Sequence, residues 1–263
     1  MIVPPGQPFD LGSVDPSSTD GPPDKKKDVE HELEKLTELQ ERLWAEATQS
    51  LLIVLQGMDT GGKDGTIKHV FRGVNPIGVK VTSFKAPSEE EKRHDFLWRV
   101  HRAVPAAGEI GIFNRSHYED VLIVRVHGWV PEAVWRARYD AIVDFERNLA
   151  AAGTTIVKFW LHISPGEQKE RLQARLDDPS KRWKFNADDL AERKLWNDYM
   201  AAAEEMLWRT STDEAPWYVV PANDKSYRNW VVNRVLVETL ERMDPQFPEP
   251  ADAAHYVIED IGG

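Results

Sequence analysis

The sequence predicts an α/β fold in which a parallel sheet is flanked by helices on both faces. Short apolar segments alternate along the chain with longer segments in which apolar residues recur at helical spacing. This alternation is typical of a parallel sheet with crossover helices. One apolar segment, residues 51–55, is followed directly by a G-x-x-x-x-G-K motif at residues 57–63. A phosphate-binding P-loop of this kind joins a strand to a helix, so the two observations together predict a three-layer P-loop fold.

The individual elements follow from residue periodicity. Residues 1–27, rich in Pro, Gly, Ser, Asp and Lys, are expected to form a disordered N-terminal arm. Helices are expected at residues 28–49, 63–73, 88–104, 118–126, 131–153, 164–176, 188–208 and 225–243. Strands are expected at residues 51–56, 79–84, 110–113, 155–163 and 217–220. The folded domain is therefore expected to span residues 28–248, with a C-terminal tail at residues 249–263.

Capping residues set several of the helix boundaries. Ser88 and Glu91 have the spacing of a capping box, which predicts a helix that continues until just before Pro105. Pro131 suits the first turn of the next long helix, and that helix is expected to stop at Gly153.

Composition limits the class of protein. A length of 263 residues with 41% hydrophobic and 29% charged residues is typical of one large globular domain. No apolar run approaches the roughly 20 residues that span a bilayer, and the start of the chain lacks a signal-peptide pattern. The absence of cysteine excludes disulfides and thiolate chemistry. A net charge of −11 argues against nucleic acid as a partner. We therefore expect a cytoplasmic protein without a nucleic-acid or membrane partner.

The loop of residues 57–63 is predicted to bind phosphate. Gly57, Gly61 and Gly62 allow backbone N–H groups to turn toward an anion without a Cβ in the way. The N-terminus of the following helix adds its positive dipole end, and Lys63 adds a full charge. A Gly-rich turn that only joined a strand to a helix would need no lysine at this position.

Two carboxylates in the loop imply a bound cation. Asp59 lies inside the loop, and Asp64 occupies the position at which P-loops usually carry Ser or Thr. Two acids would repel a phosphate unless a hard cation sits between them, so we expect Asp59 and Asp64 to hold Mg²⁺, with Mn²⁺ as the alternative. The strand at 110–113 ends in Asn114, where P-loop enzymes often place an acid, which leaves the two aspartates as the expected ligands.

Further cations are expected around the phosphates. Arg115 follows a strand at the carboxyl edge of the sheet and is suited to hold a transferring phosphoryl group. Residues 169–184 carry a dense basic cluster: Lys169, Arg171, Arg175, Lys181, Arg182 and Lys184. We expect a lid at about residues 171–195, from which Arg175 and Arg182 close over the phosphates and exclude water. A solvated helix face is the alternative interpretation of this cluster.

Four other side chains have weaker assignments. Lys68 and Arg72, on the P-loop helix, either extend a positive track for a longer anion or lie on the surface. Arg99 either contacts a nucleotide phosphate or forms a salt bridge. Trp183, inside the basic loop, is the tryptophan most suited to contact a base.

With these motifs in order, the chain resembles the family 2 polyphosphate kinases over about residues 36–248. The resemblance rests on the segments 57–65 (GMDTGGKDG), 113–120 (FNRSHYED) and the basic lid-like segment 175–185. It implies a thymidylate-kinase-like P-loop kinase fold, a requirement for Mg²⁺, and transfer of a terminal phosphoryl group between inorganic polyphosphate and a nucleotide. It also implies that relatives assemble as homodimers or homotetramers, for which the aromatic-rich helix at residues 134–145 offers an interface.

One subclass of that family resembles the chain most. The Tyr-Glu-Asp sequence at 118–120 is similar to members implied to accept both nucleoside mono- and diphosphates. We therefore expect AMP and ADP, or GMP and GDP, as acceptors, with Asn114 and Glu119 near the nucleotide. Two other functions share the same motifs. One is an ATP-dependent nucleoside monophosphate kinase, and the other is a non-catalytic nucleotide-sensing P-loop module.

Overall fold

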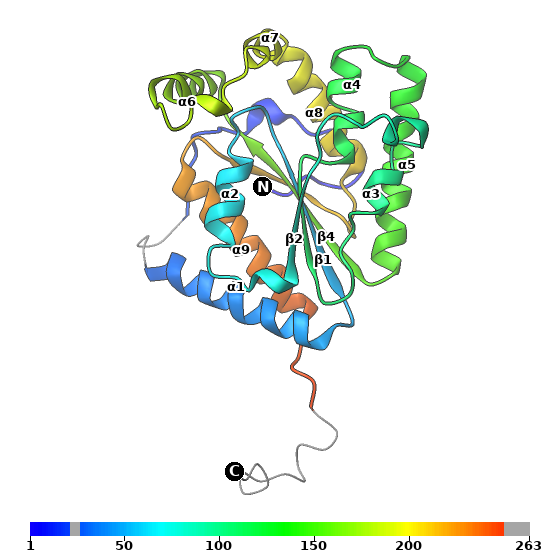
Figure 1. Ribbon diagram of the computed structural model, residues 1–263, viewed down its shortest axis with the longest axis vertical. Helices are drawn as coiled ribbons and strands as arrows, with labels where there is room; N and C mark the ends of the chain where they lie inside the picture. Colours follow the sequence, from blue (N-terminus) through cyan, green and yellow to red (C-terminus); the bar gives the residue numbers. More distant parts are fainter. Residues whose placement is uncertain (22–26, 250–263) are drawn as a thin grey trace, which may run out of the picture.

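A five-stranded parallel sheet forms the centre of the part of the chain that the structure describes (Figure 1). This computed structural model describes residues 1–21 and 27–249, and only the backbone of residues 27–29. The strands are β1 (Ser50–Gln56), β2 (Val79–Ser83), β3 (Ile110–Asn114), β4 (Thr154–His162) and β5 (Trp217–Pro221). Their order is β2-β3-β1-β4-β5, and all neighbouring pairs are parallel. The predicted fold class is confirmed.

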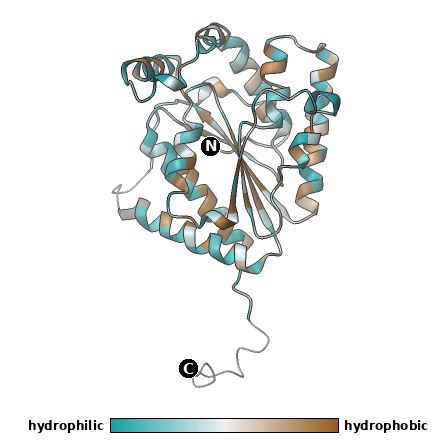
Figure 2. Cartoon of the chain, viewed as in Figure 1, coloured by the Kyte–Doolittle hydropathy of each residue, from teal (hydrophilic) through white to brown (hydrophobic). Residues whose placement is uncertain are grey.

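Helices cover both faces of this sheet (Figure 1). One face carries α1 (Lys27–Glu46), α2 (Lys63–Val70) and α9 (Lys225–Met243). The other face carries α3 (Trp98–His101), α4 (Ile123–Val126), α5 (Glu132–Ala151) and α8 (Trp196–Thr210). Two helices, α6 (Pro165–Asp177) and α7 (Asp188–Lys194), lie beyond the carboxyl ends of the strands. Figure 2 shows that hydrophobic residues gather on the strands, which places the core between the layers.

The direction of the chain across the sheet reverses at β1. The neighbours of β1 are β3 on one side and β4 on the other, and the outer strands β2 and β5 lie beyond them. The register places Leu55 of β1 beside Asn114 of β3 and Phe159 of β4. Ligands of open α/β sheets bind at the carboxyl ends of the strands where the strand order reverses. The residues that follow β1 and β3 therefore emerge at the edge that is best placed for a ligand.

The expectation of a disordered N-terminal arm is wrong for residues 1–21. Val3, Leu11 and Val14 are buried in the core, and Ile2 pairs with Tyr218 of β5 in an antiparallel bridge. The arm thus covers the edge of β5, where unpaired backbone groups would otherwise face solvent. Apolar side chains separated by prolines and polar residues gave no periodic signal, so composition alone suggested disorder. Residues 22–26 of the predicted arm lie outside the described residues.

The predicted helix at residues 88–104 is interrupted. The capping box forms, since Ser88 N donates to Glu91 Oε2 (2.7 Å) and Glu91 N donates to Ser88 Oγ (3.2 Å). It nevertheless supports only a 3₁₀ turn at Glu91–Arg93, followed by the single turn of α3. The Asp95 side chain accepts a hydrogen bond from Leu97 N (2.9 Å). The break itself lies at His94, whose backbone is extended. The local bond of Asp95 just before α3 offers the backbone an alternative to one continuous helix.

The predicted helix at residues 188–208 is divided at Leu195 into α7 and α8. No Gly or Pro marks the division. The orientation of α7 is instead held by contacts with distant elements. The Arg193 side chain donates to Pro165 O (2.7 Å) and Gln168 Oε1 (2.8 Å) of α6, and Glu192 pairs with His127 (3.0 Å). The predicted helix at residues 118–126 is likewise divided, into a 3₁₀ turn at His117–Asp120 and α4.

The remaining helices and strands match the predictions to within a few residues. Within the described ranges, no helix has the length and apolar character needed to cross a membrane. Of the predicted C-terminal tail, residues 250–263 lie outside the described residues.

Candidate active site

The predicted P-loop links the end of β1 to the start of α2. β1 is buried along its whole length, so the loop begins on a fixed support. Gly57 has a φ of +151°, and a Cβ at this position would lie 2.7 Å from Leu161 O of β4. Gly62 has a φ of +105° and forms the N-cap of α2. Glycine is therefore required at both positions, as the motif predicted, because the backbone is left-handed or closely approached.

Lys63 lies within the loop, where it is nearly buried. Its Nζ donates to Gly57 O (2.7 Å) and Met58 O (3.3 Å). Burial lowers the pKa of the Lys63 ammonium, and the neighbouring charge of Arg115 lowers it further, while nearby carboxylates oppose the shift. Two backbone carbonyl groups of the P-loop thus fix the position of the Lys63 ammonium.

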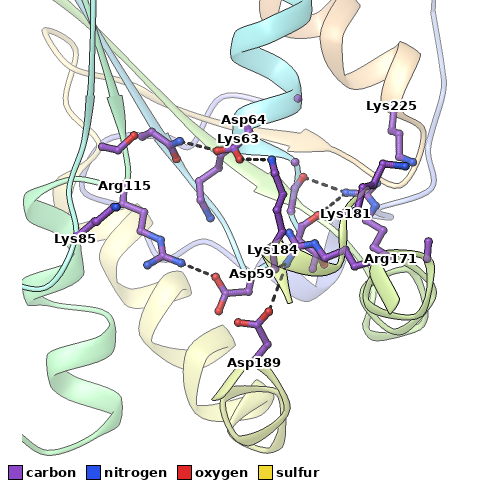
Figure 3. A pocket seen from close by; sticks show the side chains of 18 of the residues that line it. Asp59, Lys63, Asp64, Lys85, Arg115, Arg171, Lys181, Lys184, Asp189 and Lys225 are labelled. Atoms are coloured by element: carbon purple, nitrogen blue, oxygen red, sulfur yellow. Dashed lines mark hydrogen bonds and ion pairs between the residues drawn. The ribbon is translucent and has the colours of Figure 1, made fainter. Parts of the chain in front are cut away.

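Asp64 joins three elements of the site. Its carboxylate accepts from Asn114 Nδ2 at the end of β3 (2.8 Å) and from Lys184 Nζ in the segment between α6 and α7 (3.1 Å). Burial would raise the pKa of the Asp64 carboxyl, but these hydrogen bonds and the Lys184 charge outweigh it and lower the pKa. The predicted lid segment therefore contacts the P-loop directly (Figure 3).

Asp59 and Arg115 form an ion pair across the site. The Arg115 guanidinium lies 2.7 Å from the Asp59 carboxylate. Burial would lower the pKa of Arg115, but the charges of Glu119 and Asp59 outweigh it and raise the pKa, which keeps the guanidinium charged. Arg115 has a φ of +60° and Thr60, in the loop, a φ of +64°. Left-handed backbone at residues other than Gly is concentrated where function demands it.

A cavity of about 680 Å³ opens above the P-loop (Figure 3). The cationic residues that line it are Lys63, Lys85, Arg115, Arg171, Arg175, Lys181, Lys184 and Lys225. The acidic ones are Asp59, Asp64 and Asp189. Cations exceed carboxylates here in a chain whose net charge is −11. Such local concentration of positive charge attracts anionic ligands into a cleft.

A second cavity, of about 240 Å³, adjoins the first. Met58, Leu122, Ile123 and Trp160 give it apolar walls. Its acidic residues are Asp59, Glu119, Asp188, Asp189 and Glu192, with Arg115 as the cation. Burial raises the pKa of the Glu119 carboxyl, although Arg115 opposes the shift. The second cavity thus has the opposite charge character to the first.

Three residues line both cavities: Asp59, Arg115 and Asp189. Burial and then the Asp59 charge raise the pKa of the Asp189 carboxyl, which pairs with Arg175 at 3.4 Å. These three residues mark the junction through which a group would pass from one cavity to the other.

Five predicted site residues lie outside both cavities. Lys68 and Arg72 are exposed on and just after α2, and neither lines a cavity. Arg99 donates to Lys85 O (2.8 Å), and its guanidinium lies 3.6 Å from the Glu91 carboxylate. Of the two alternatives given for Arg99, the structure therefore shows the salt bridge. The Arg182 guanidinium donates to Leu176 O (2.7 Å) in its own segment. Trp183 is 77% exposed.

Other site residues had no sequence signal strong enough to identify them. Lys85 follows β2, Asp189 lies in the first turn of α7, and Lys225 begins α9. Each is an ordinary charged residue at the end of an element, and only the strand order brings them together. Arg171 was part of the predicted basic cluster. It donates to Thr60 O (2.9 Å) and Gly61 O (3.1 Å), so it also supports the P-loop.

A buried polar network lies beneath the segment that carries Arg115 and Glu119. Lys158 of β4 donates to Glu146 Oε2 of α5 (2.6 Å), Tyr118 OH (2.8 Å) and Thr210 O (2.6 Å). His117 Nε2 lies 3.3 Å from Glu146 Oε1. All of these side chains are buried. The network fixes the turn His117–Asp120 to β4 and α5. No sequence motif indicated it.

The donor set at the P-loop fits a divalent metal. Asp59 and Asp64 line the same cavity as Gly61, Gly62 and Lys63 of the P-loop. Across residues 1–21 and 27–249, no three His, Asp or Glu side chains form a metal cage by themselves. Mg²⁺ is commonly held by one or two carboxylates together with substrate phosphates, so two aspartates are sufficient protein ligands.

The potential interface predicted on the helix at 134–145 is only partly available. Trp135, Tyr139 and Phe145 of α5 are buried against the chain's own core, whereas Val134 is exposed. The aromatic content of this helix therefore reflects core packing.

Comparisons with known proteins give a consistent result. The family model described as polyphosphate kinase 2 matches residues 21–248. An AMP/ADP-polyphosphate phosphotransferase of Meiothermus ruber is 57% identical over 224 residues, covering 85% of this chain and 84% of the relative. An ADP-polyphosphate phosphotransferase of Rhodopseudomonas palustris is 46% identical, covering 94% and 91%. The crystal structure of polyphosphate kinase 2 from Arthrobacter aurescens TC1 superposes with a TM-score of 0.92 at 48% identity, covering 98% and 93%.

Proposed function

The chain belongs to the polyphosphate kinase 2 family, and on that basis we propose that it transfers phosphoryl groups between inorganic polyphosphate and nucleotides. The acceptors would be AMP and ADP, as in the name of the Meiothermus ruber relative. The observation that carries the proposal is the cavity above the P-loop, where cations outnumber carboxylates in an acidic protein. An ATP-dependent nucleoside monophosphate kinase and a nucleotide sensor are less well supported, because the named relatives are polyphosphate phosphotransferases.

We infer that polyphosphate occupies the cationic cavity. Its terminal phosphate would lie on the loop residues Gly61, Gly62 and Lys63, which line this cavity, and on Gly57, which lines the adjoining one. Arg175 would contact the chain beyond it. Lys181 and Lys184 take the place that the sequence assigned to Arg182. Positive charge from three separate elements suits a ligand that carries a negative charge on each phosphate.

The nucleoside would occupy the second cavity. Its apolar walls suit a base, and its carboxylates, Glu119 among them, can accept hydrogen bonds from hydroxyl or amino groups. The same carboxylates repel phosphate, so the nucleotide would point its phosphates toward Arg115. Asn114, which lines the first cavity only, would then lie nearer the phosphates than the base.

Transfer would take place at the junction between the two cavities. Arg115 lines both cavities and is suited to hold the transferring group, whose charge is spread over its equatorial oxygens. Asp59 and Asp64 would hold Mg²⁺, with Mn²⁺ as the alternative, and the metal would neutralise charge on the phosphates. No nucleophilic side chain is needed, because an oxygen of the acceptor phosphate would attack the terminal phosphorus of polyphosphate directly. The bond from that phosphorus to the bridging oxygen would break, and the polyphosphate chain would leave one phosphate shorter.

The test supplies AMP or ADP with polyphosphate and Mg²⁺, without ATP, and separates the nucleotide products. ADP from AMP and ATP from ADP are expected. Product that forms only when ATP replaces polyphosphate would indicate a nucleoside monophosphate kinase. Nucleotide binding without product from either donor would indicate a sensing module.

The role of Arg115 is tested by Arg115→Gln, which removes the charge at the junction. Turnover should fall at least about 100-fold, because the guanidinium acts on charge that develops during transfer. Arg147→Gln is the matched control, since Arg147 lies on the surface of α5 and its ion-pair partner among the described residues is the exposed Asp144 (2.6 Å). Similar turnover for Arg115→Gln and the control would contradict this assignment.

We also propose a homodimer or homotetramer, which light scattering combined with size-exclusion chromatography would measure. A monomer at micromolar concentration would contradict it. This expectation rests on the family resemblance.

A further inference from the structure

Arg228, on the first turn of α9, is a buried arginine that forms no ion pair with any carboxylate of residues 1–21 and 30–249. Its side chain is 2% exposed. Its Nε and Nη2 donate to one acceptor, the Asn229 side-chain oxygen, at 3.1 and 2.8 Å. No ion pair of Arg228 is present in the part of the chain that the structure describes. Buried charges are normally paired, since an unpaired one loses its hydration without compensation.

The guanidinium of Arg228 lies against the P-loop. A Cβ on Gly62 would lie 2.9 Å from Arg228 Cζ, and a Cβ on Gly65 would lie 3.4 Å from Arg228 Nη2. Gly62 is the N-cap of α2, and Gly65 lies in its first turn. Both residues also line the cationic cavity. Arg228 therefore packs against backbone that lines the cavity, although Arg228 is not itself one of the lining residues.

The position of Arg228 is electrostatically unfavourable in the protein alone. The N-terminus of a helix carries a partial positive charge, and Arg171 Nη1 lies 3.5 Å from the same Cβ position on Gly62. Burial, and then the Arg171 charge, lower the pKa of Arg228 to about 10, although Asp224 opposes the shift. The arginine remains charged at neutral pH beside groups of the same sign.

Arg171 differs from Arg228 in having structural partners. It pairs with Glu167 (2.6 Å) and donates to backbone carbonyls of the P-loop. Its charge is compensated, and its contacts explain its presence. The bond of Arg228 to its own neighbour on α9 ties no second element to the loop. A compensating negative charge for Arg228 can come from an anion bound in the cavity that Gly62 and Gly65 line.

We propose that Arg228 is a positioning residue for phosphate binding, whose fixed positive charge beside the P-loop backbone strengthens the binding of an anionic substrate by the loop. It acts through the loop backbone and does not touch the anion. This role rests on the proposed function, in which that substrate is polyphosphate. An uncompensated charge that is fixed before binding requires no reorganisation when the anion arrives.

The test compares R228M, which keeps an apolar stem without charge, with R228K, which keeps the charge. Inorganic tripolyphosphate is the probe, and its dissociation constant is measured by titration calorimetry at two salt concentrations. R228M should bind about 10-fold more weakly, or about 1.4 kcal/mol, with a smaller dependence on salt. R228K should bind within about 3-fold of the parent. R228Q is measured in parallel, so that the result does not depend on the folding of one uncharged variant.

Two controls separate an electrostatic role from a structural one. R234M changes an exposed arginine of the same helix that pairs with Glu32 and Glu238, and its tripolyphosphate affinity should be unchanged. The melting temperature of R228M without ligand should equal or exceed that of the parent, because an unfavourable charge has been removed. In the transfer assay the KM for polyphosphate should rise more than kcat falls.

Two results would overturn the proposal while leaving the proposed function intact. One is parent-like tripolyphosphate affinity in R228M and R228Q. The other is equal loss of affinity in R228M and R228K together with a lowered melting temperature, which would indicate packing. Failure of the parent protein itself to bind tripolyphosphate would remove the proposed function and this role of Arg228 together.

Discussion

Lys158→Met should destabilise the protein strongly, because it breaks a buried ion pair from one side. Lys158 Nζ donates to Glu146 Oε2 and Thr210 O, each at 2.6 Å, and to Tyr118 OH at 2.8 Å. In the variant, Glu146 stays buried without its cation and Thr210 O loses a donor. Removing one partner of a buried pair costs about 3–5 kcal/mol.

The loss should be visible in both chemical and thermal unfolding. At about 2.1 cal/mol/K of unfolding entropy per residue, a chain of 263 residues loses about 7 °C for about 4 kcal/mol. Urea titration followed by circular dichroism gives the free energy of unfolding. Lys35→Met is the matched control, because Lys35 and Glu241 form a half-exposed pair. Exposed pairs contribute about 0–1 kcal/mol.

The destabilisation should also depend on pH. Burial alone would raise the pKa of the Glu146 carboxyl, but the charge of Lys158 and the bond from His117 outweigh it and lower the pKa. Without Lys158, burial prevails and the folded-state pKa of Glu146 rises above its unfolded value. Stability is then lost as pH rises through that raised pKa. Lys158→Met should therefore lose more free energy at about pH 8.5 than at about pH 5.5.

The double variant Lys158→Met/Glu146→Leu decides whether the cost arises from the unpaired charge. Replacing both partners by apolar residues is often close to neutral, so the double variant should recover most of the stability. A cost below about 1 kcal/mol for Lys158→Met would refute the explanation by an unpaired buried charge. A double variant whose loss of unfolding free energy equals the sum of the losses in the two single variants would also refute it. Recovered stability with reduced turnover would indicate that the pair is retained to hold the turn that carries Glu119.

Three further changes test the site. Glu119→Gln should raise the melting temperature at about pH 8 and leave it unchanged at about pH 4. Burial raises the folded-state pKa of Glu119, so ionisation of this carboxyl costs stability as pH rises. Equal shifts of the melting temperature at both pH values would contradict this. Gly57→Ala should lower the free energy of unfolding by about 1–3 kcal/mol and abolish tripolyphosphate binding, since the added Cβ would lie 2.7 Å from Leu161 O. A parent-like affinity for tripolyphosphate, measured by calorimetry, would disprove it. Lys184→Met should raise the KM for polyphosphate about 5-fold with little change in kcat, because it removes a cation from the cavity in which polyphosphate is proposed to bind. An unchanged KM would show that the segment does not bind the donor.

The geometry of the P-loop could be predicted because its determinants are local in sequence. The strand, the glycines and Lys63 lie within a dozen or so consecutive residues, and each has a separate physical reason to be there. Asn114 and Arg115 could also be placed, because residues that follow neighbouring parallel strands meet at one edge of the sheet. Their register beside Leu55 confirms that argument.

The rest of the site depends on contacts between residues distant in sequence. Asp189 reaches the P-loop only because α7 separates from α8 at Leu195, a division held by contacts of Arg193 with α6. Trp183 and Arg182 were predicted from the density of charge in their segment, but the side-chain directions of a short 3₁₀ turn cannot be inferred from composition. In this turn the neighbouring residue, Lys184, points to Asp64 instead.

The opposite charges of the two cavities favour one orientation of each substrate in the proposed reaction. A nucleotide that entered backwards would place its phosphates among Glu119, Asp188 and Glu192, where they would be repelled. In the forward orientation the phosphates approach Arg115, and the donor chain approaches the same residue from the cationic side. Each polyanion thus meets compensating charge only if its reactive end faces the other. Specificity for end-to-end transfer can therefore arise from the distribution of charge between the cavities, before any contact with a base is considered.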